Sequence, residues 1–224
     1  IFAQRGKIYD RSGDVVLAGN KTSFALTIVP SEVPRDRLDE TLVTVAELLG
    51  RDVGEMRDRI ERRRGGAPQG IEIAAGLNLA ELTLVAERID QLPGTSWYAK
   101  PEREYPLAEL TSHVVGYVGE ITPEELQVLY NEGYTAASVL GKSGVEEEYD
   151  RLLRGKDGRR FRTVDARGRR VGDEEKVIPP EEGMDLVLTI DRSLQQLAQD
   201  ALGARIGSVV ALKPSNGEIL AMVS

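Results

Sequence analysis

The segment LGKSGVEEEYDRLLRG, residues 140–155, contains two short patterns that occur in catalytic sites. Gly141-Lys142-Ser143 matches the end of a P-loop, which binds nucleotide phosphates through backbone N–H groups, a lysine and a hydroxyl. Lys142-Ser143-Gly144 matches the Lys-Ser/Thr-Gly box of serine acyl-transfer enzymes. Either pattern would make this segment part of an active site, so each has to be compared with the residues that the chemistry needs elsewhere.

The P-loop interpretation fails on its first glycine. A P-loop requires glycine five residues before Gly141, directly after a buried strand. That position holds Ala136, and the preceding YNEGYTAAS is not a hydrophobic strand. We therefore reject a nucleotide site here.

The serine-enzyme interpretation fails on its partners. The hydroxyl nucleophile of these enzymes lies in a Ser-x-x-Lys box, where the lysine one helical turn later serves as base, and a Ser-x-Asn box accompanies it. No serine stands three residues before any lysine of this chain, and no Ser-x-Asn occurs. The segment after Ser143 is also predicted to be helical, whereas the Lys-Ser/Thr-Gly box lies on a strand.

Helix capping explains the same residues without catalysis. Ser143-Gly144-Val145-Glu146 matches Ser-x-x-Glu, in which the serine hydroxyl and the glutamate carboxylate each accept from the other residue's backbone N–H. The acidic residues that follow favour the start of a helix, and Gly155 favours its end. We expect one helix, with an apolar face formed by Val145, Tyr149, Leu152 and Leu153.

His113 is the only histidine, and the chain has no cysteine. Metal sites built from several histidines or from cysteines are therefore excluded, as are disulfides and thiol catalysis. His113 could act as a catalytic base, but beside Val114 and Val115 it is more simply a packing residue. We predict no metal and no cofactor.

Composition and element order indicate an α+β protein. A net charge of −8 and few aromatic residues argue against a nucleic-acid-binding surface. The order of the predicted strands and helices lacks regular βαβ alternation, which excludes a doubly wound fold. The chain begins with Ile1 rather than Met and stops within the apolar EILAMVS, so we expect a piece of a longer protein. The most definite predicted elements are strands at 5–20 and 23–30, helices at 34–50, 53–64, 78–94 and 122–133, and hairpins turning at 166–168 and at 216–217.

A set of motifs along the chain resembles class B penicillin-binding proteins, in the order of that family and with details that favour its elongation-type members. They are RGKIYDRSGDVVLA (5–18), YPLAELTSHVVGYVGEIT (105–122), GKSGVEEEYDRLLRGKDG (141–158), VDARGRRV, PPEEGMDLVLTIDRSLQQLAQDAL (179–202) and GSVVALKPSNGEILAMVS (207–224).

This resemblance implies an extended pedestal, or dimerisation domain, at 1–183, with a helical head at about 31–95. Residues 184–224 would form the first helix and hairpin of a D,D-transpeptidase domain that cross-links peptidoglycan. The family's nucleophile box lies beyond this sequence, so no catalytic residue is carried over. We expect the chain itself neither to react with penicillin nor to cross-link peptides.

The resemblance also implies location and partners. It places the chain on the extracytoplasmic face of the bacterial inner membrane, with a membrane anchor upstream of residue 1. Partners would be a RodA-type peptidoglycan glycosyltransferase and a scaffold protein of the elongation machinery. The charged helices of the head and the Arg62-Arg63-Arg64 run are the candidate partner surface.

The motif matches nominate structural or partner-contact residues. Arg5, Asp10 and Arg11 could form an internal ion pair at the pedestal root, or could contact the glycosyltransferase. The full set is Arg5, Gly6, Asp10, Arg11, His113, Gly116, Glu120, Ser143, Gly144, Glu146 and Asp191. The alternative function is that of a generic envelope adaptor without any transpeptidase domain.

Overall fold

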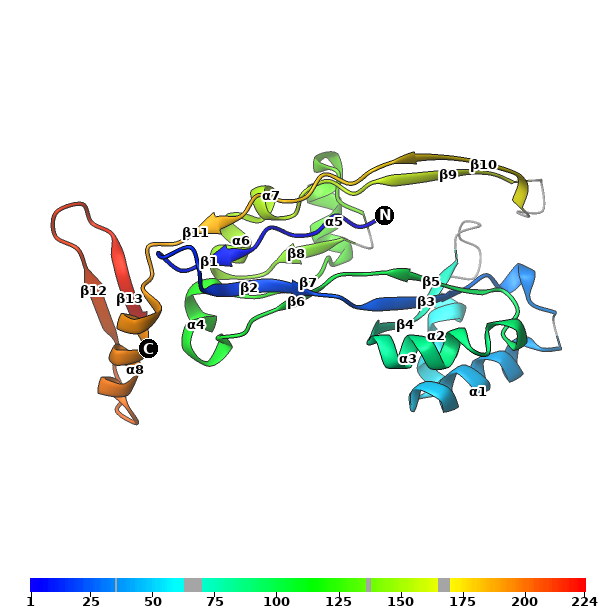
Figure 1. The fold of residues 1–224 in the computed structure, drawn as a ribbon, viewed down its shortest axis with the longest axis horizontal. Coiled ribbons are helices and arrows are strands. Elements are labelled where there is room, and N and C mark those ends of the chain that lie inside the picture. Colours follow the sequence, from blue (N-terminus) through cyan, green and yellow to red (C-terminus); the bar gives the residue numbers. More distant parts are fainter. Residues whose placement is uncertain (35, 63–69, 136–137, 165–169) are drawn as a thin grey trace.

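The computed structural model describes residues 1–34, 36–62, 70–135, 138–164 and 170–224. The molecule is elongated, with a central body, a head at one end and a small C-terminal unit at the other (Figure 1). A two-stranded ribbon extends from the central body alongside the head. The mixture of short sheets and packed helices confirms the predicted α+β class.

The central body is built on a four-stranded sheet of order β11-β1-β2-β6. Its strands are β1 (Ile8–Tyr9), β2 (Val16–Lys21), β6 (Glu102–Glu104) and β11 (Leu186–Val187). The extended pieces predicted within 5–20 are present as β1 and β2, which pair antiparallel, while β11 joins β1 in parallel from near the other end of the sequence. Ile8 on β1 and Leu17 on β2 are fully buried with Leu153 in the core of this body.

Short helices and a second small sheet complete the central body. They are α4 (Ala108–Val115), β7 (Val118–Glu120), α5 (Pro123–Leu129), a 3₁₀ turn (Tyr130–Glu132), β8 (Val139–Gly141), α6 (Gly144–Glu148) and α7 (Asp150–Leu153). β7 and β8 pair antiparallel. The predicted helix start at Thr122 is confirmed, because Thr122 and Glu125 form both hydrogen bonds of a capping box.

The head places three helices against a sheet of order β4-β3-β5. Its elements are β3 (Phe24–Ile28), α1 (Leu38–Leu49), α2 (Val53–Arg62), β4 (Ile71–Leu77), α3 (Leu79–Ala86), β5 (Thr95–Ala99) and 3₁₀ turns at Pro30–Glu32 and Ile89–Gln91. Leu26, Val45 and Met56 lie in its apolar core. The helix predicted at 78–94 does start at Asn78, which forms a capping box with Glu81, but α3 ends at Ala86. Arg63 and Arg64 of the arginine run lie outside the described residues.

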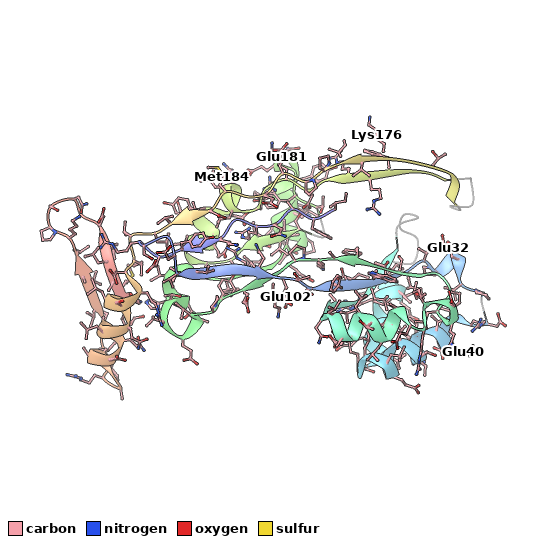
Figure 2. All side chains as sticks on the ribbon, viewed as in Figure 1. Glu32, Glu40, Glu102, Lys176, Glu181 and Met184 are labelled. Atoms are coloured by element: carbon pink, nitrogen blue, oxygen red, sulfur yellow. The ribbon has the colours of Figure 1, made fainter. Side chains whose placement is uncertain are left out.

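The ribbon consists of β9 (Arg159–Val164) and β10 (Arg170–Ile178), which pair antiparallel. The two arms of the predicted hairpin are thus confirmed, whereas its turn at 166–168 lies outside the described residues. Figure 2 shows Lys176 pointing outward from the ribbon, and Glu181 and Met184 lying where the chain runs back along the central body.

The C-terminal unit, residues 192–224, has a small core of its own. Helix α8 (Arg192–Leu202) packs on the hairpin of β12 (Val209–Leu212) and β13 (Ile219–Val223), burying Ala198, Ala221 and Val223. The predicted turn at Asn216-Gly217 is confirmed, because both N–H groups bond back to the carbonyl of Lys213. In the described part of the chain, no helix has the length and apolar character to span a bilayer.

Candidate functional site

Four charged side chains meet inside the central body. Glu146 on α6 is fully buried, and its carboxylate accepts from two arginines. Arg5 Nε lies 2.6 Å from Oε2, and Arg103 Nε lies 2.7 Å from Oε1. Arg5 Nη2 also donates to the backbone carbonyl of Glu146 at 3.0 Å. The second carboxylate, Asp150, lies 2.8 Å from Arg5 Nη1. The two positive and two negative charges of this cluster therefore neutralise one another away from solvent.

Asp150 ties the charge cluster to neighbouring elements. Its Oδ1 accepts from the backbone N–H of Gly141 at 2.8 Å, and its Oδ2 accepts from the hydroxyl of Tyr134. Burial, together with the hydrogen bond to the Asp150 carboxylate, raises the pKa of Tyr134 to about 12. On the other side, burial and the charge of Glu146 raise the pKa of Tyr105 to about 12. The cluster therefore holds both phenols in their protonated form.

Arg103 joins the cluster to the N-terminal segment. Its Nη1 donates to the carbonyl of Gly6 at 2.8 Å and to Asn20 Oδ1 at 3.2 Å. Asn20 in turn donates to the carbonyl of Arg5 at 2.6 Å. Nη2 of Arg103 is buried and has no hydrogen-bond partner among the described residues. The cluster thus connects β2, β6 and α6 with the start of the chain.

The predicted Ser143–Glu146 capping box is wrong. Ser143 does occupy the N-cap position of α6, but its side chain makes no capping hydrogen bond, and the Glu146 carboxylate lies on the arginines instead. The carboxylate gains two ion-pair hydrogen bonds from the guanidinium groups, whereas the cap would give it one bond to an uncharged backbone N–H. Arg5 and Arg103 therefore determine where the glutamate points.

The single predicted helix is also interrupted. α6 ends at Glu148, and Tyr149 separates it from α7. Leu153 is fully buried, whereas Tyr149 and Leu152 are each more than 40% exposed, so the predicted apolar face is only partly buried. Lys142, the lysine of both catalytic patterns, pairs with Glu125 at 2.5 Å. That contact lowers the pKa of Glu125.

Gly116 and Gly144 allow α4 and α6 to approach backbone to backbone. Gly116 has φ = 77°, and a Cβ built there would lie 1.9 Å from the carbonyl oxygen of Ser143. A Cβ on Gly144 would lie 2.6 Å from the carbonyl oxygen of Val114. No side chain fits at either position without moving backbone. The two separated motifs that contain these glycines are therefore halves of one contact.

Asp10 and Arg11 lie where the central body meets the C-terminal unit. Asp10 does not pair with an arginine side chain in the contacts observed; it accepts from the hydroxyl and N–H of Ser12 and, at 3.4 Å, from the N–H of Arg192. Burial alone would raise the pKa of Asp10, but these hydrogen bonds lower it below its usual value. Arg11 lies 3.7 Å from Glu218, and its N–H donates to the carbonyl of Ile190 at 2.9 Å.

The remaining nominated residues have separate positions. Glu120 is exposed at the end of β7. Asp191 caps α8 by accepting from the N–H groups of Ser193 and Leu194. Gly6 lies against Met184, where a Cβ would meet the carbonyl oxygen at 1.9 Å. These residues are not gathered into one site.

His113 lies on α4 with an exposed ring, and its Nε2 is 2.5 Å from the carbonyl oxygen of Met222 on β13. It thus contacts the C-terminal unit and does not pack in the core beside Val114 and Val115. Sequence reasoning missed Gln195, which is fully buried and contacts the same carbonyl. The sequence offered one signal: Gln195 stands three residues before Ala198 and seven before Leu202, on the same side of the predicted helix as these apolar residues.

The buried charges neutralise one another, and in the described ranges no three His, Asp or Glu side chains gather to hold a metal ion. A small polar depression of about 180 Å³ lies beside the cluster, lined by residues 4–7, Asn20, Glu182, Gly183 and Asp185. Its walls carry both signs of charge, which favours no single class of ligand.

Comparison with known proteins agrees with this architecture. Residues 1–188 match the family described as the Penicillin-binding Protein dimerisation domain. The chain is 36% identical over 226 residues to the peptidoglycan D,D-transpeptidase MrdA of Acinetobacter baumannii, covering 98% of this chain and 32% of that protein. It is 33% identical over 231 residues to MrdA of Escherichia coli K12, covering 100% of this chain and 36% of that protein. The chain thus spans about a third of the length of these relatives.

A solved structure shares the fold throughout. The penicillin-binding protein PBP2 in a complex with MreC from Helicobacter pylori superposes with a TM-score of 0.81 and 25% sequence identity. The match covers 100% of this chain and 41% of that chain. The resemblance expected from the motifs is therefore confirmed: this chain belongs to the penicillin-binding protein dimerisation domain family.

Proposed function

We propose that this chain is the non-catalytic pedestal of a peptidoglycan D,D-transpeptidase, and that it positions the catalytic domain on the extracytoplasmic face of the bacterial inner membrane. The observation that carries the proposal is the likeness of the whole chain to PBP2, together with relatives that are named D,D-transpeptidases. The charge cluster supports it, because its bonds tie together segments that lie far apart in the sequence.

The pedestal would comprise residues 1–183, and residues 184–224 would begin the catalytic domain. Leu186–Val187 still pair with β1, so the chain leaves the central sheet just after the proposed boundary. A new core then begins with α8 and the β12–β13 hairpin. A segment that forms a hydrophobic core of its own, separate from the core of the central body, is expected where a further domain begins.

The proposed partners are an elongation scaffold protein and a membrane glycosyltransferase of the RodA type. The structural relative is a complex with MreC, which supports a scaffold of that kind. On the head, α1 and α2 present an exposed pair of Arg57 and Asp39, with Nη2 and Oδ1 2.7 Å apart. We place the partner surface on these charged helices.

A labelled β-lactam and the coding sequence test the first part of the proposal. The chain should remain unlabelled under conditions that label a complete penicillin-binding protein. Stoichiometric labelling of the chain would show a serine site within it. The parent gene should encode a Ser-x-x-Lys box after residue 224, and a stop codon there would contradict a transpeptidase parent.

Binding measurements test the partner surface. Interferometry with the extracytoplasmic part of an elongation scaffold should show binding that Arg57→Glu weakens. The matched control is Arg151→Glu on α7, since Arg151 is a more exposed arginine in a surface ion pair away from the head. Equal effects of the two substitutions would remove the head from the proposal.

A further inference from the structure

Gln195 on α8 ties together three elements that meet at the junction of the central body and the C-terminal unit. Its Nε2 donates to the carbonyl of Leu110 on α4 at 3.0 Å and to the carbonyl of Met222 on β13 at 2.5 Å. Its Oε1 accepts from the N–H of Met222 at 2.8 Å. The side chain is fully buried, so each of these bonds replaces one that water would otherwise supply.

The amide of Gln195 acts on β13 as a neighbouring strand would. A strand partner accepts from an N–H and donates to a C=O, and a primary amide offers the same acceptor and donor side by side. Gln195 presents both to the two backbone groups of Met222. The remaining N–H of its amide reaches Leu110, which lies in a different part of the molecule.

Helix α4 makes a second contact with the C-terminal unit, from the side chain of His113 to the carbonyl of Met222. Its Nε2 lies 2.5 Å from the oxygen of Met222, so α4 contacts β13 directly through His113 and indirectly through Gln195. The β1–β2 turn makes the other attachment, where the N–H of Arg192 donates to Asp10, and the N–H of Arg11 donates to Ile190 just before the unit begins. The unit is therefore held at two separate places, which restrict its rotation on the central body more than either attachment alone.

We propose that Gln195 is the positioning residue that sets the orientation of the C-terminal unit on the central body, through its joint contact with Leu110 and Met222. Helix α4 is itself held by the close approach of Gly116 to α6, which carries Glu146 of the charge cluster. The orientation of β13 therefore depends on α4. The inference rests on the proposed function, because that function makes the C-terminal unit the start of the catalytic domain.

Pairs of spin labels measure this orientation directly. The chain has no cysteine, so Glu104→Cys on β6 and Ser215→Cys in the β12–β13 turn, both exposed, give two unique labelling sites. The unaltered junction should give one narrow distance peak. Gln195→Ala should lose that single peak and give a broad distribution, and Gln195→Met, which keeps the side-chain length without the hydrogen bonds, should do the same.

Matched controls separate positioning from stability. Gln196→Ala changes the neighbouring glutamine, which is exposed and donates to Asp200 within α8, and should keep the narrow peak. A second label pair within the central body, Glu104→Cys with Glu147→Cys, should be unaffected by Gln195→Met. His113→Ala should broaden the junction peak less than Gln195→Met, because it removes one bond.

Two results would overturn the proposal. One is a narrow, unshifted junction peak in Gln195→Met. The other is broadening of both label pairs, which would make Gln195 a residue of general stability. Should the distances behave as expected while the parent gene lacks a Ser-x-x-Lys box, the positioning role stands and the proposed function fails.

Discussion

Arg5 and Glu146 are 141 positions apart in the chain, yet Nε of the arginine lies 2.6 Å from the glutamate carboxylate inside the central body. Arg103 meets the other oxygen of the same carboxylate. Desolvating charges is costly, and such a group stabilises a fold only when its members satisfy one another. Removing one member should therefore lower the free energy of unfolding by much more than the intact cluster adds to it on balance.

Glu146→Gln should destabilise the chain strongly. It leaves the two arginines buried with Asp150 as their one carboxylate, and breaking a buried pair in this way typically costs about 3–5 kcal/mol. Urea unfolding measures the free energy. Glu147→Gln, on the exposed side of the same short helix, should stay within about 0.5 kcal/mol of the unaltered chain. A Glu146→Gln variant as stable as this control would show that the cluster is not structural.

Ser143→Ala should have little effect, within about 0.5 kcal/mol, because the hydroxyl makes no capping bond. Thr122→Ala provides the comparison, since Thr122 does accept from the N–H of Glu125 and its loss should cost about 1 kcal/mol. Thermal unfolding of both variants checks the difference. Equal losses of stability in the two variants would contradict the structure and would support a capping bond from Ser143.

Gly116→Ala should disrupt the contact between α4 and α6. The new Cβ would collide with the backbone of Ser143, and we expect a loss of at least roughly 3 kcal/mol, the upper end of local backbone strain. Gly13→Ala isolates the conformational part, because Gly13 has a similar φ of 78° and nothing within 4 Å of its Cβ position. It should cost about 1 kcal/mol. The prediction fails if chemical denaturation finds the two variants alike.

Stability should fall at alkaline pH because of Tyr105 and Tyr134. Each pKa is raised from 10.0 to about 12 on folding, so the unfolded chain ionises first. Their contribution is complete below pH 10 and is lost as the pH rises through 12. Urea midpoints at pH 9 and pH 11 should differ more for the unaltered chain than for Tyr105→Phe. An identical shift in both would contradict the assignment for Tyr105.

Local signals predicted many of the elements. The capping boxes at Thr122 and Asn78 and the hairpin at Asn216-Gly217 depend on residues within a few positions of one another, and all three are present. The same local logic failed at Ser143, because its partner Glu146 had a stronger alternative that no local spacing reveals. The P-loop and serine-box interpretations were rejected on missing residues, and in the structure the lysine of both patterns, Lys142, pairs with Glu125.

The sequence by itself determined the α+β class, most helix starts and turns, and the family, since each follows from short-range patterns or from motifs in order. Only the tertiary structure decided that Glu146 neutralises Arg5 and Arg103, that Gly116 and Gly144 share one contact, and that Gln195 joins α4 to β13. The physical reason is distance along the chain. A buried charge or amide takes the strongest partners that folding brings within about 3 Å, and sequence spacing does not encode which those are.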